Sequence, residues 1–313
     1  MKLAVIDLGT NTFHLLIVDL KERDFSVVFK EKTAVKLGKG GISKGLITDD
    51  AQERALKALK RFKEVIDVHE VELVSATATS AIRNAKNGQD LVDLIALQTG
   101  IKTRVIDGLQ EATFIYNGVK KALDIGPKPS LIIDIGGGSI EFIIGSRDQI
   151  FWKRSFEIGG QRLIDRYHKQ DPISSEENET LVSYLDEELK SLKEIAKHYE
   201  IDTLIGSSGT FDTLSDIYCI KNGIDKAPEA TELPLDFDEF HEIVDDLIAK
   251  SKAQRLEIPG MIQLRVDMIV VAVILVRHIT KMLNIKNIRV SSYALKEGVL
   301  LATIDSIKTK TLK

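Results

Sequence analysis

The amino-acid sequence predicts an α/β protein made of two similar halves, and three observations support this prediction. An apolar strand that enters an Asp-Xaa-Gly loop and leaves it as a second apolar strand occurs twice, over residues 3–18 and 131–144. Along the rest of the chain, residue patterns typical of strands and of amphipathic helices alternate. The length of 313 residues exceeds what one hydrophobic core comfortably fills, so two domains are expected.

The first half is expected to begin with three strands and to continue with alternating helices and strands. Ala55, Leu59 and Phe62 recur at three- and four-residue intervals, which predicts an amphipathic helix. A run of small and hydroxylated residues over 75–81 is typical of a strand end that faces a ligand cleft. The expected elements are strands at 3–6, 13–18 and 25–30, a loop at 30–45, a helix at 49–68, a strand at 71–74, a helix at 89–98, a strand at 102–106 and a helix at 110–123.

A domain boundary is expected at Gly-Pro-Lys-Pro, 126–129, because two prolines so close together cannot continue a helix. The sequence thus predicts a first domain over 1–124, joined by the C-terminal helix 296–313, and a second domain over 125–295. The expected elements of the second half are strands at 131–133 and 140–144, a helix at 174–199 that a capping box opens, a strand at 203–206, a helix from 207, a surface excursion over 222–234, helices at 238–250 and 265–283, a strand at 288–290 and a final helix through 307.

Composition argues against several classes of protein. A net charge of -4 with 6% aromatic residues disfavours a nucleic-acid binder or a membrane-surface protein, which usually carry a basic excess. Cys219 is the only cysteine, so there is no internal disulfide and no thiolate metal cluster, which fits a reducing compartment. The longest apolar run, 268–276, is shorter than the ~18 residues that a membrane span needs. We therefore expect a cytoplasmic protein with no nucleic-acid partner and no membrane partner, and a homodimer is left open.

Six segments carry a resemblance to a known family. In chain order they are DLGTNTFH (7–14), TSAIRNA (79–85), GLQEA (108–112), DIGGGSIE (134–141), SGT (208–210) and ALKEGVL (294–300). Together they resemble the exopolyphosphatase and guanosine pentaphosphate phosphohydrolase (Ppx/GppA) family of the actin-like ATPase (ASKHA) superfold. The resemblance implies a two-domain actin-like (ribonuclease H-like) α/β fold with an interdomain cleft.

The resemblance also implies an activity, that of a Mg²⁺-dependent exopolyphosphatase that releases terminal phosphate from inorganic polyphosphate. It makes Glu111 the residue that orients and deprotonates the attacking water, Glu141 a second functional acid, and Arg83 a bidentate clamp on phosphate. Each residue also has an ordinary structural interpretation. Glu111 could be a first-turn carboxylate favoured by the helix dipole, Glu141 a solvent-facing strand residue, and Arg83 a surface arginine.

Metal and phosphate ligands follow from the same resemblance. Asp7 and Asp134 would face each other across the cleft and hold Mg²⁺, with a monovalent cation such as K⁺ as an optional companion. Both aspartates could instead form Asx-turns, and glycines also end helices for structural reasons. The expected phosphate-binding residues are Gly9, Thr10, Asn11, Gly136, Gly137, Gly138, Ser139, Gly209 and Thr210.

Other polar residues near these motifs are open to two interpretations. His14 matches the family pattern, but within an apolar strand it is interpreted as a core histidine. Arg265 and Asp267 resemble a family pair near the cleft, or cap the apolar helix that follows them. A set of lysines around the first glycine loop could guide a polyphosphate chain or form a solvated face. These are Lys30, Lys32, Lys36, Lys39 and Lys44.

Three departures from the family pattern leave alternative functions open. Gln110 stands where the family commonly has Glu, Ile140 where it often has Thr, and Tyr293 where it often has Gly. The large ring of Tyr293 favours inorganic polyphosphate over guanosine pentaphosphate (pppGpp), whose hydrolysis is the main alternative. The second alternative is a low-turnover regulator that binds polyphosphate or a nucleotide. The third is an actin-like sugar kinase, and the segment around Glu111 argues against it. The chain resembles the short form of the family, which predicts short to medium polyphosphates as substrates.

Overall fold

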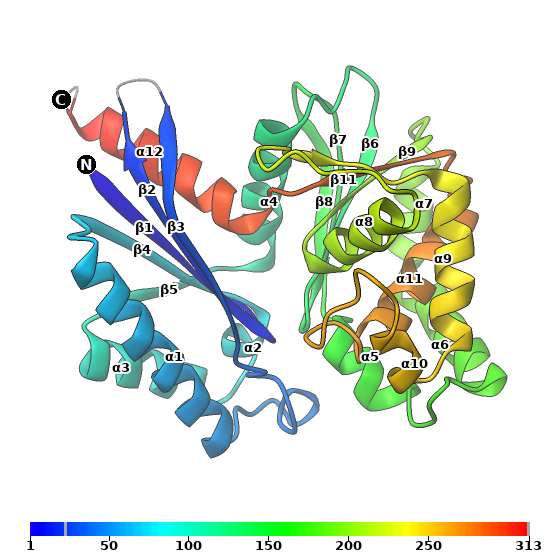
Figure 1. Cartoon of the computed structure of the whole chain (residues 1–313), viewed down its shortest axis with the longest axis horizontal. Helices are drawn as coiled ribbons and strands as arrows, with labels where there is room; N and C mark the ends of the chain where they lie inside the picture. The colour runs from blue at the N-terminus through cyan, green and yellow to red at the C-terminus, as the bar shows by residue number, and fades with distance from the viewer. Residues whose placement is uncertain (22–23, 312–313) are drawn as a thin grey trace. The chain divides into compact units, whose positions relative to one another are not determined.

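The computed structural model describes residues 1–21 and 24–311. This part of the chain forms two compact units, each with its own sheet and hydrophobic core (Figure 1). The domain limits predicted from the sequence stay a prediction, and residues 312–313 of the predicted C-terminal segment lie outside the described residues. The first unit contains Met1–Gly118, Gly136–Gly138 and the chain from Leu295, and the second contains Val119–Ile135 and Ser139–Ala294.

The sheet of the first unit has five strands, which are β1 (Lys2–Leu8), β2 (Thr12–Leu20), β3 (Phe25–Ala34), β4 (Leu73–Ala78) and β5 (Thr103–Val105). Their spatial order is β3-β2-β1-β4-β5. β2 pairs antiparallel with both β1 and β3, whereas β1, β4 and β5 pair parallel. The Asp-Xaa-Gly loop therefore joins the two central strands of the sheet, β1 and β2.

The sheet of the second unit repeats this plan. Its strands are β6 (Ser130–Ile135), β7 (Ile140–Gly145), β8 (Ile150–Phe156), β9 (Thr203–Ser207), β10 (Glu232–Leu233) and β11 (Asn287–Ser291). Read from β8, their order is β8-β7-β6-β9-β11-β10, with β8, β7 and β6 antiparallel and β6, β9 and β11 parallel. Because both sheets combine an antiparallel hairpin and third strand with parallel strands in the same order, the predicted α/β fold of two similar actin-like halves is confirmed.

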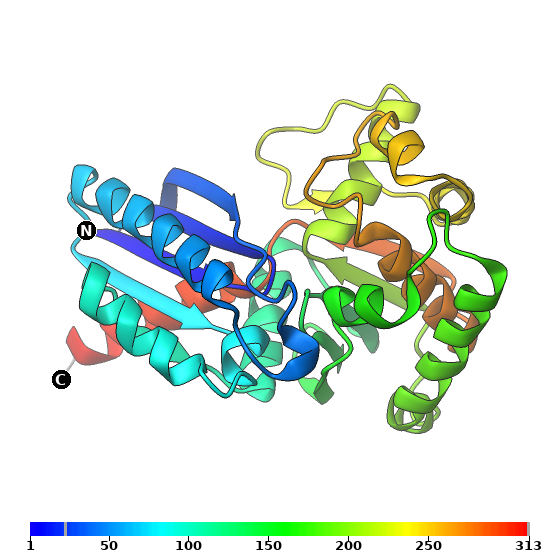
Figure 2. The same ribbon diagram turned by 90° about the horizontal axis from the view of Figure 1, so that it is seen from below.

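The helices of the first unit bury apolar stripes against its sheet. They are the short 3-10 helix η1 (Ile42–Lys44), α1 (Asp49–Val68), α2 (Ser80–Arg83), α3 (Gly88–Thr99), α4 (Gly108–Ala122) and α12 (Leu295–Thr311). α1 begins where the Thr48 side chain accepts a hydrogen bond from the Ala51 amide, and its apolar residues join those of β1 and β2 in one core. Figures 1 and 2 show α1 and α3 on one face of the sheet and α12 on the other.

The second unit is built around one apolar helix, α11 (Ile269–Met282). Every side chain from Ile269 to Val276 is buried, so the prediction of a buried helix rather than a membrane span is confirmed. None of the described helices is both long and apolar enough to cross a lipid bilayer. α11 contacts α5 (Gly160–Tyr167), α6 (Ser175–Glu188), α8 (Gly209–Lys221) and α9 (Phe237–Ala249), and α7 (Lys190–Ala196) and α10 (Lys252–Leu256) complete the unit.

Some element predictions were wrong in detail. The helix predicted over 174–199 is interrupted at Leu189, although the predicted capping box of Ser174 and Glu177 is present. α11 begins at Ile269 rather than at 265, because a turn precedes it in which the amides of Met268 and Ile269 both donate to the Arg265 carbonyl. β8, α5 and α10 were not predicted.

Candidate active site

The first glycine loop is a tight turn that follows Asp7 at the end of β1. Asp7 lies opposite His14 of β2 and Thr77 of β4 in the strand register. The amide of Gly9 donates to the carbonyl oxygen of Thr12 at 3.2 Å, and a β-carbon at Gly9 would lie only 2.8 Å from the same oxygen. The sequence therefore needs glycine here for the backbone to turn back on itself.

Arg83 and Glu111, predicted to act on the same phosphate, are brought together in the first unit. The Arg83 side chain, just after the end of β4, donates through Nη1 to Glu111 Oε2 at 2.8 Å and to the Ile106 carbonyl at 3.1 Å. Glu111 is only 6% exposed. Asp107 caps α4 by accepting from the amides of Leu109 and Gln110 at 2.9 and 2.8 Å, which fixes the turn that carries Glu111.

The second glycine loop, Gly136–Gly138, belongs to the first compact unit, although the strands on either side of it belong to the second. A β-carbon at Gly138 would lie 2.6 Å from the hydroxyl oxygens of both Ser80 and Thr10, and one at Gly137 would lie 2.9 Å from Asn11 Cγ. Glycine at both positions therefore lets the loop approach these polar side chains closely. The structure thus brings the predicted residues Thr10, Asn11, Gly137 and Gly138 together.

Two buried carboxylates lie side by side in the sheet of the second unit. Asp134 on β6 and Glu141 on β7 are direct partners in the register, so their side chains share one face. They are 7% and 1% exposed. Ser207 Oγ donates to Asp134 Oδ2 at 2.8 Å and Ser155 Oγ to Glu141 Oε1 at 2.6 Å. Adjacent buried carboxylates repel each other unless donors or a cation offset their charge, and here each accepts a hydrogen bond from a serine hydroxyl.

Arg265 adds a buried positive charge close to this pair. It is 6% exposed, and its guanidinium lies against Gly209, where any β-carbon would overlap it. Burial lowers the pKa of Arg265, while the negative charges of Asp212 and Asp134 act to raise it. Gly209 opens α8, so the guanidinium and a helix N-terminus lie together, an arrangement that favours an anion.

Thr210 is 1% exposed, and its hydroxyl oxygen has no hydrogen-bond partner among residues 1–21 and 24–311. It stands at the second residue of α8, beside Gly209. A buried hydroxyl without a partner in the folded chain is unusual, because leaving it unsatisfied costs free energy. The position fits a ligand oxygen, in agreement with the predicted phosphate role of Gly209 and Thr210, which stays a prediction.

Sequence reasoning missed the two serines that hold the carboxylates. Ser207 could have been suspected, since it ends a strand and precedes the predicted helix, but Ser155 lies on the unpredicted β8 and carried no signal. For Arg265 the sequence left two interpretations open, one of a family pair near the cleft and one of a helix cap, and the structure places its guanidinium against Gly209 at the start of α8. Gly136 is half-buried in the first unit and Ser139 is buried in the second.

The predicted ligands Asp7 and Asp134 suit a hard cation such as Mg²⁺, which does not need a complete set of protein ligands. Among the described residues, no group of three or more His, Cys, Asp or Glu side chains could hold a metal ion. Mg²⁺ commonly binds through one or two carboxylates together with water and substrate phosphate oxygens, so it does not need such a group. The predicted ligands Asp7 and Asp134 belong to the first and the second unit respectively.

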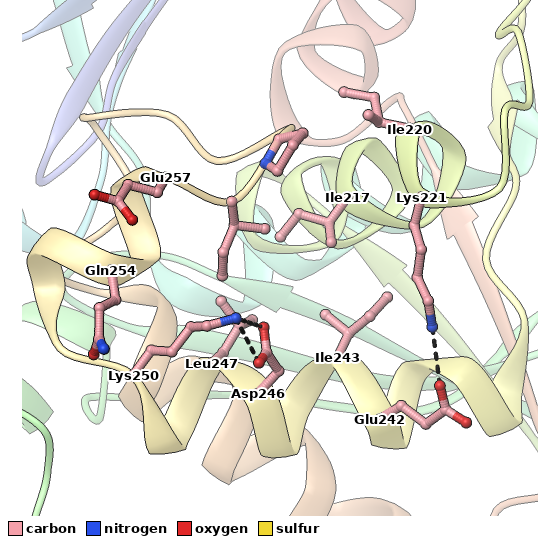
Figure 3. A pocket seen from close by; sticks show the side chains of 12 residues that line it. Ile217, Ile220, Lys221, Glu242, Ile243, Asp246, Leu247, Lys250, Gln254 and Glu257 are labelled. Carbon is pink, nitrogen blue, oxygen red and sulfur yellow. Dashed lines mark hydrogen bonds and ion pairs between the residues drawn. The ribbon is translucent and has the colours of Figure 1, made fainter.

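A pocket of about 680 Å³ lies elsewhere in the second unit, between α8, α9 and α10 (Figure 3). Its floor includes Ile217, Ile243 and Leu247. The two lysines at its rim are already paired, Lys221 with Glu242 at 2.9 Å and Lys250 with Asp246 at 2.6 Å. An aliphatic floor with neutralised lysines does not suit a polyanion, and no predicted site residue lines this pocket.

The chain is similar to known proteins both in sequence and in fold. Residues 16–307 match the model of the Ppx/GppA phosphatase family. The crystal structure of an exopolyphosphatase from Cytophaga hutchinsonii is 45% identical, with 98% of each chain covered and a TM-score of 0.94. That of the Aquifex aeolicus member of the Ppx/GppA family is 26% identical, with 98% of each chain covered and a TM-score of 0.80.

Proposed function

The chain belongs to the Ppx/GppA phosphatase family and hydrolyses phosphoanhydride bonds, and from this premise we propose that it releases the terminal phosphate of inorganic polyphosphate. The observation that carries the proposal is the buried carboxylate of Glu111, fixed by the Arg83 guanidinium at 2.8 Å in the first turn of α4. The 45% identity with a protein described as an exopolyphosphatase supports the same substrate class.

In the proposed step, Glu111 orients a water molecule and accepts one of its protons as the water oxygen bonds to the terminal phosphorus. The bond from that phosphorus to the bridging oxygen breaks, and the electron pair stays on the shortened chain. The products are orthophosphate and a polyphosphate one unit shorter. Arg83, already beside the carboxylate, is placed to stabilise the negative charge on the phosphoryl oxygens.

The remaining predicted residues are proposed to hold the substrate. Asp7 and Asp134 would supply carboxylate oxygens for Mg²⁺, and the bound cation would neutralise phosphate charge. Glu141 lies beside Asp134 in the sheet and adds to the negative potential that attracts the cation. Backbone amides of the two glycine loops and of the start of α8 donate to phosphate oxygens.

Tyr293 favours polyphosphate over guanosine pentaphosphate within this proposal. The residue is half-buried, and its backbone is fixed on both sides by Ser291, whose Oγ accepts from the Tyr293 amide at 3.2 Å and donates to its carbonyl at 2.7 Å. A large ring held in this way, where the family often has glycine, leaves less room for a nucleoside.

The test is phosphate release from polyphosphates of graded length and from guanosine pentaphosphate, with Mg²⁺ and with a chelator. We expect release from short and medium polyphosphates that stops when the cation is removed. Faster release from guanosine pentaphosphate would make the nucleotide the substrate. Tight binding of polyphosphate with negligible release would instead indicate a regulator and contradict the proposal.

A further inference from the structure

The first glycine loop rests on a second loop that follows β3. The carbonyl oxygen of Asn11 accepts from two successive amides, those of Val35 at 3.0 Å and Lys36 at 2.9 Å. The carbonyl oxygen of Thr10 accepts from the amide of Gly38 at 3.0 Å. These bonds fix the orientation of the peptide units next to the amides that are proposed to hold phosphate.

The Arg54 side chain on α1 holds the supporting loop. Its Nε donates to the Val35 carbonyl at 2.7 Å and its Nη2 to the Lys36 carbonyl at 3.0 Å. Lys36 has a φ of 50°, a left-handed conformation that a residue with a side chain adopts only when its surroundings enforce it. The two carbonyls that Arg54 binds are those of Val35 and of this strained residue.

Arg54 binds backbone carbonyls, whereas most described arginines of the chain pair with carboxylates. No carboxylate among residues 1–21 and 24–311 pairs with it, and its hydrogen bonds within that part of the chain go to the two backbone carbonyls. A guanidinium suits this task, since its donors form a rigid planar fork that can meet two neighbouring acceptors at once. Lysine offers a single ammonium without that fixed geometry.

We propose that Arg54 is a positioning residue for phosphate hydrolysis. It holds Val35 and Lys36, which in turn fix the peptide units of Thr10 and Asn11, and so sets the direction of the amides that contact the terminal phosphate. The inference rests on the proposed function, because the phosphate role of this loop is part of it.

The experiment compares Arg54→Met, which keeps an apolar stem and removes the donors, with Arg54→Lys and with Arg61→Met. Arg61 is the matched control because it lies on the same helix with its side chain 58% exposed and pairs only loosely with Glu31 at 3.8 Å and Glu64 at 3.6 Å. The measurements are kcat and KM for polyphosphate, the melting temperature, and amide hydrogen exchange in the peptide that contains Val35, Lys36 and Gly38.

We expect Arg54→Met to lower kcat by about 10-fold, since a misplacement of ~1 Å in a reacting site can cost up to ~10²-fold in rate. KM should change less than kcat, because the second glycine loop and the start of α8 are also proposed to bind the substrate and are not held by Arg54. Exchange at the amides of Val35, Lys36 and Gly38, which donate to the Asn11 and Thr10 carbonyls, should accelerate in Arg54→Met. It should return partly toward the wild-type rate in Arg54→Lys and stay at the wild-type rate in Arg61→Met.

An unchanged kcat in Arg54→Met would overturn the positioning role, as would an equal loss in Arg61→Met. A lower kcat that accompanies only a lower melting temperature, with normal exchange at Val35, Lys36 and Gly38, would also overturn it. If the wild-type protein releases no phosphate from any substrate tested, the proposed function fails separately. Amide exchange then decides by itself whether Arg54 holds the loop.

Discussion

Glu111 is buried in the first turn of α4 and pairs with Arg83. We expect removal of its negative charge to affect catalysis more than the stability of the fold. Glu111→Gln keeps the size of the side chain and its bond from Arg83, but cannot accept a proton from water. We predict that kcat for phosphate release falls by ~10²–10⁴-fold, the usual contribution of a general base. The check is a phosphate assay on protein whose circular dichroism matches wild type.

The matched control for this variant is Glu257→Gln, which alters an exposed carboxylate near α10. It should leave kcat unchanged. Undiminished activity of Glu111→Gln would mean that another group activates the water.

Ser207 is expected to stabilise the fold through the carboxylate that it holds. Ser207→Ala removes the hydroxyl that donates to Asp134 at 2.8 Å and leaves a buried charge with one donor fewer. We predict a loss of about 1–3 kcal/mol in the free energy of unfolding, the cost of an unsatisfied buried polar group. Urea unfolding measures this, with the exposed Ser183→Ala as the control, and equal stability of the two variants would contradict it.

Single site residues could be proposed from the sequence where their neighbours along the chain form a motif, as with Arg83 and Glu111. The sequence did not allow prediction of Ser207 and Ser155 as partners of carboxylates. Ser207 meets Asp134 across 73 residues of chain, so their contact depends on strand pairing rather than on local pattern. The structure shows where these residues lie, and the roles of all the predicted site residues, Arg83 and Glu111 included, stay predictions.

Helices α4 and α12 meet at a glycine, and this contact links the C-terminal helix to the one that carries Glu111. A β-carbon at Gly298 would overlap the carbonyl group of Phe114, one turn after Glu111 on α4. Helix propensity alone would favour alanine at Gly298 by about 1 kcal/mol. The overlap with a backbone atom should outweigh that gain, since overpacking typically costs about 1–3 kcal/mol.

We therefore predict that Gly298→Ala destabilises the protein and lowers kcat, because α4 must shift to relieve the overlap. Urea unfolding and the phosphate assay measure the two effects. Ser306→Ala, at an exposed position of the same helix, should change neither. A higher free energy of unfolding for Gly298→Ala than for wild type would contradict the prediction, because it would mean that α4 and α12 can move apart without loss of stability.

Elements were predictable where apolar periodicity was strong, as in α1, α11 and the two hairpins. β8 was missed because charged residues, Lys153 and Arg154, interrupt its apolar run and most of its side chains are only partly buried. The predicted helix over 174–199 has continuous periodicity through Leu185, Leu189 and Leu192, all buried. A local change of backbone direction at Leu189 does not alter that pattern, so the sequence could not show it.

Stability of the whole molecule is expected to depend on pH through His168. Burial and the nearby positive charge of Arg255 lower the pKa of His168 below its ordinary value of 6.5, although Asp171, Glu177 and Asp267 oppose them. The folded protein therefore binds fewer protons than the unfolded chain when the pH falls below 6.5. The free energy of unfolding should thus decrease as the pH drops from 6.5 toward the lowered pKa.

Urea unfolding at several pH values between about 5 and 8 measures this dependence. His168→Gln should flatten the acid side of the profile, whereas the exposed His198→Gln should leave it unchanged. A profile with the same acid slope in His168→Gln and wild type would contradict the prediction.

The two-unit α/β architecture could be predicted because its defining feature, the Asp-Xaa-Gly hairpin, is local and occurs twice. The sequence could not predict that Gly136–Gly138 belongs to the first unit. This grouping depends on the close approach of the loop to Thr10 and Ser80, which are distant in sequence. The family resemblance was readable for a similar reason, since its motifs are short, ordered and spread over most of the chain.

The first unit is assembled from both ends of the chain, since α12 joins residues up to Gly118. Amino-terminal segments leave the ribosome first and begin to fold while synthesis continues. β1 and β4, which α12 contacts, are therefore translated long before the helix that covers them. Until α12 has been translated, the nascent first unit presents an uncovered apolar sheet face, the kind of surface that a cotranslational chaperone binds.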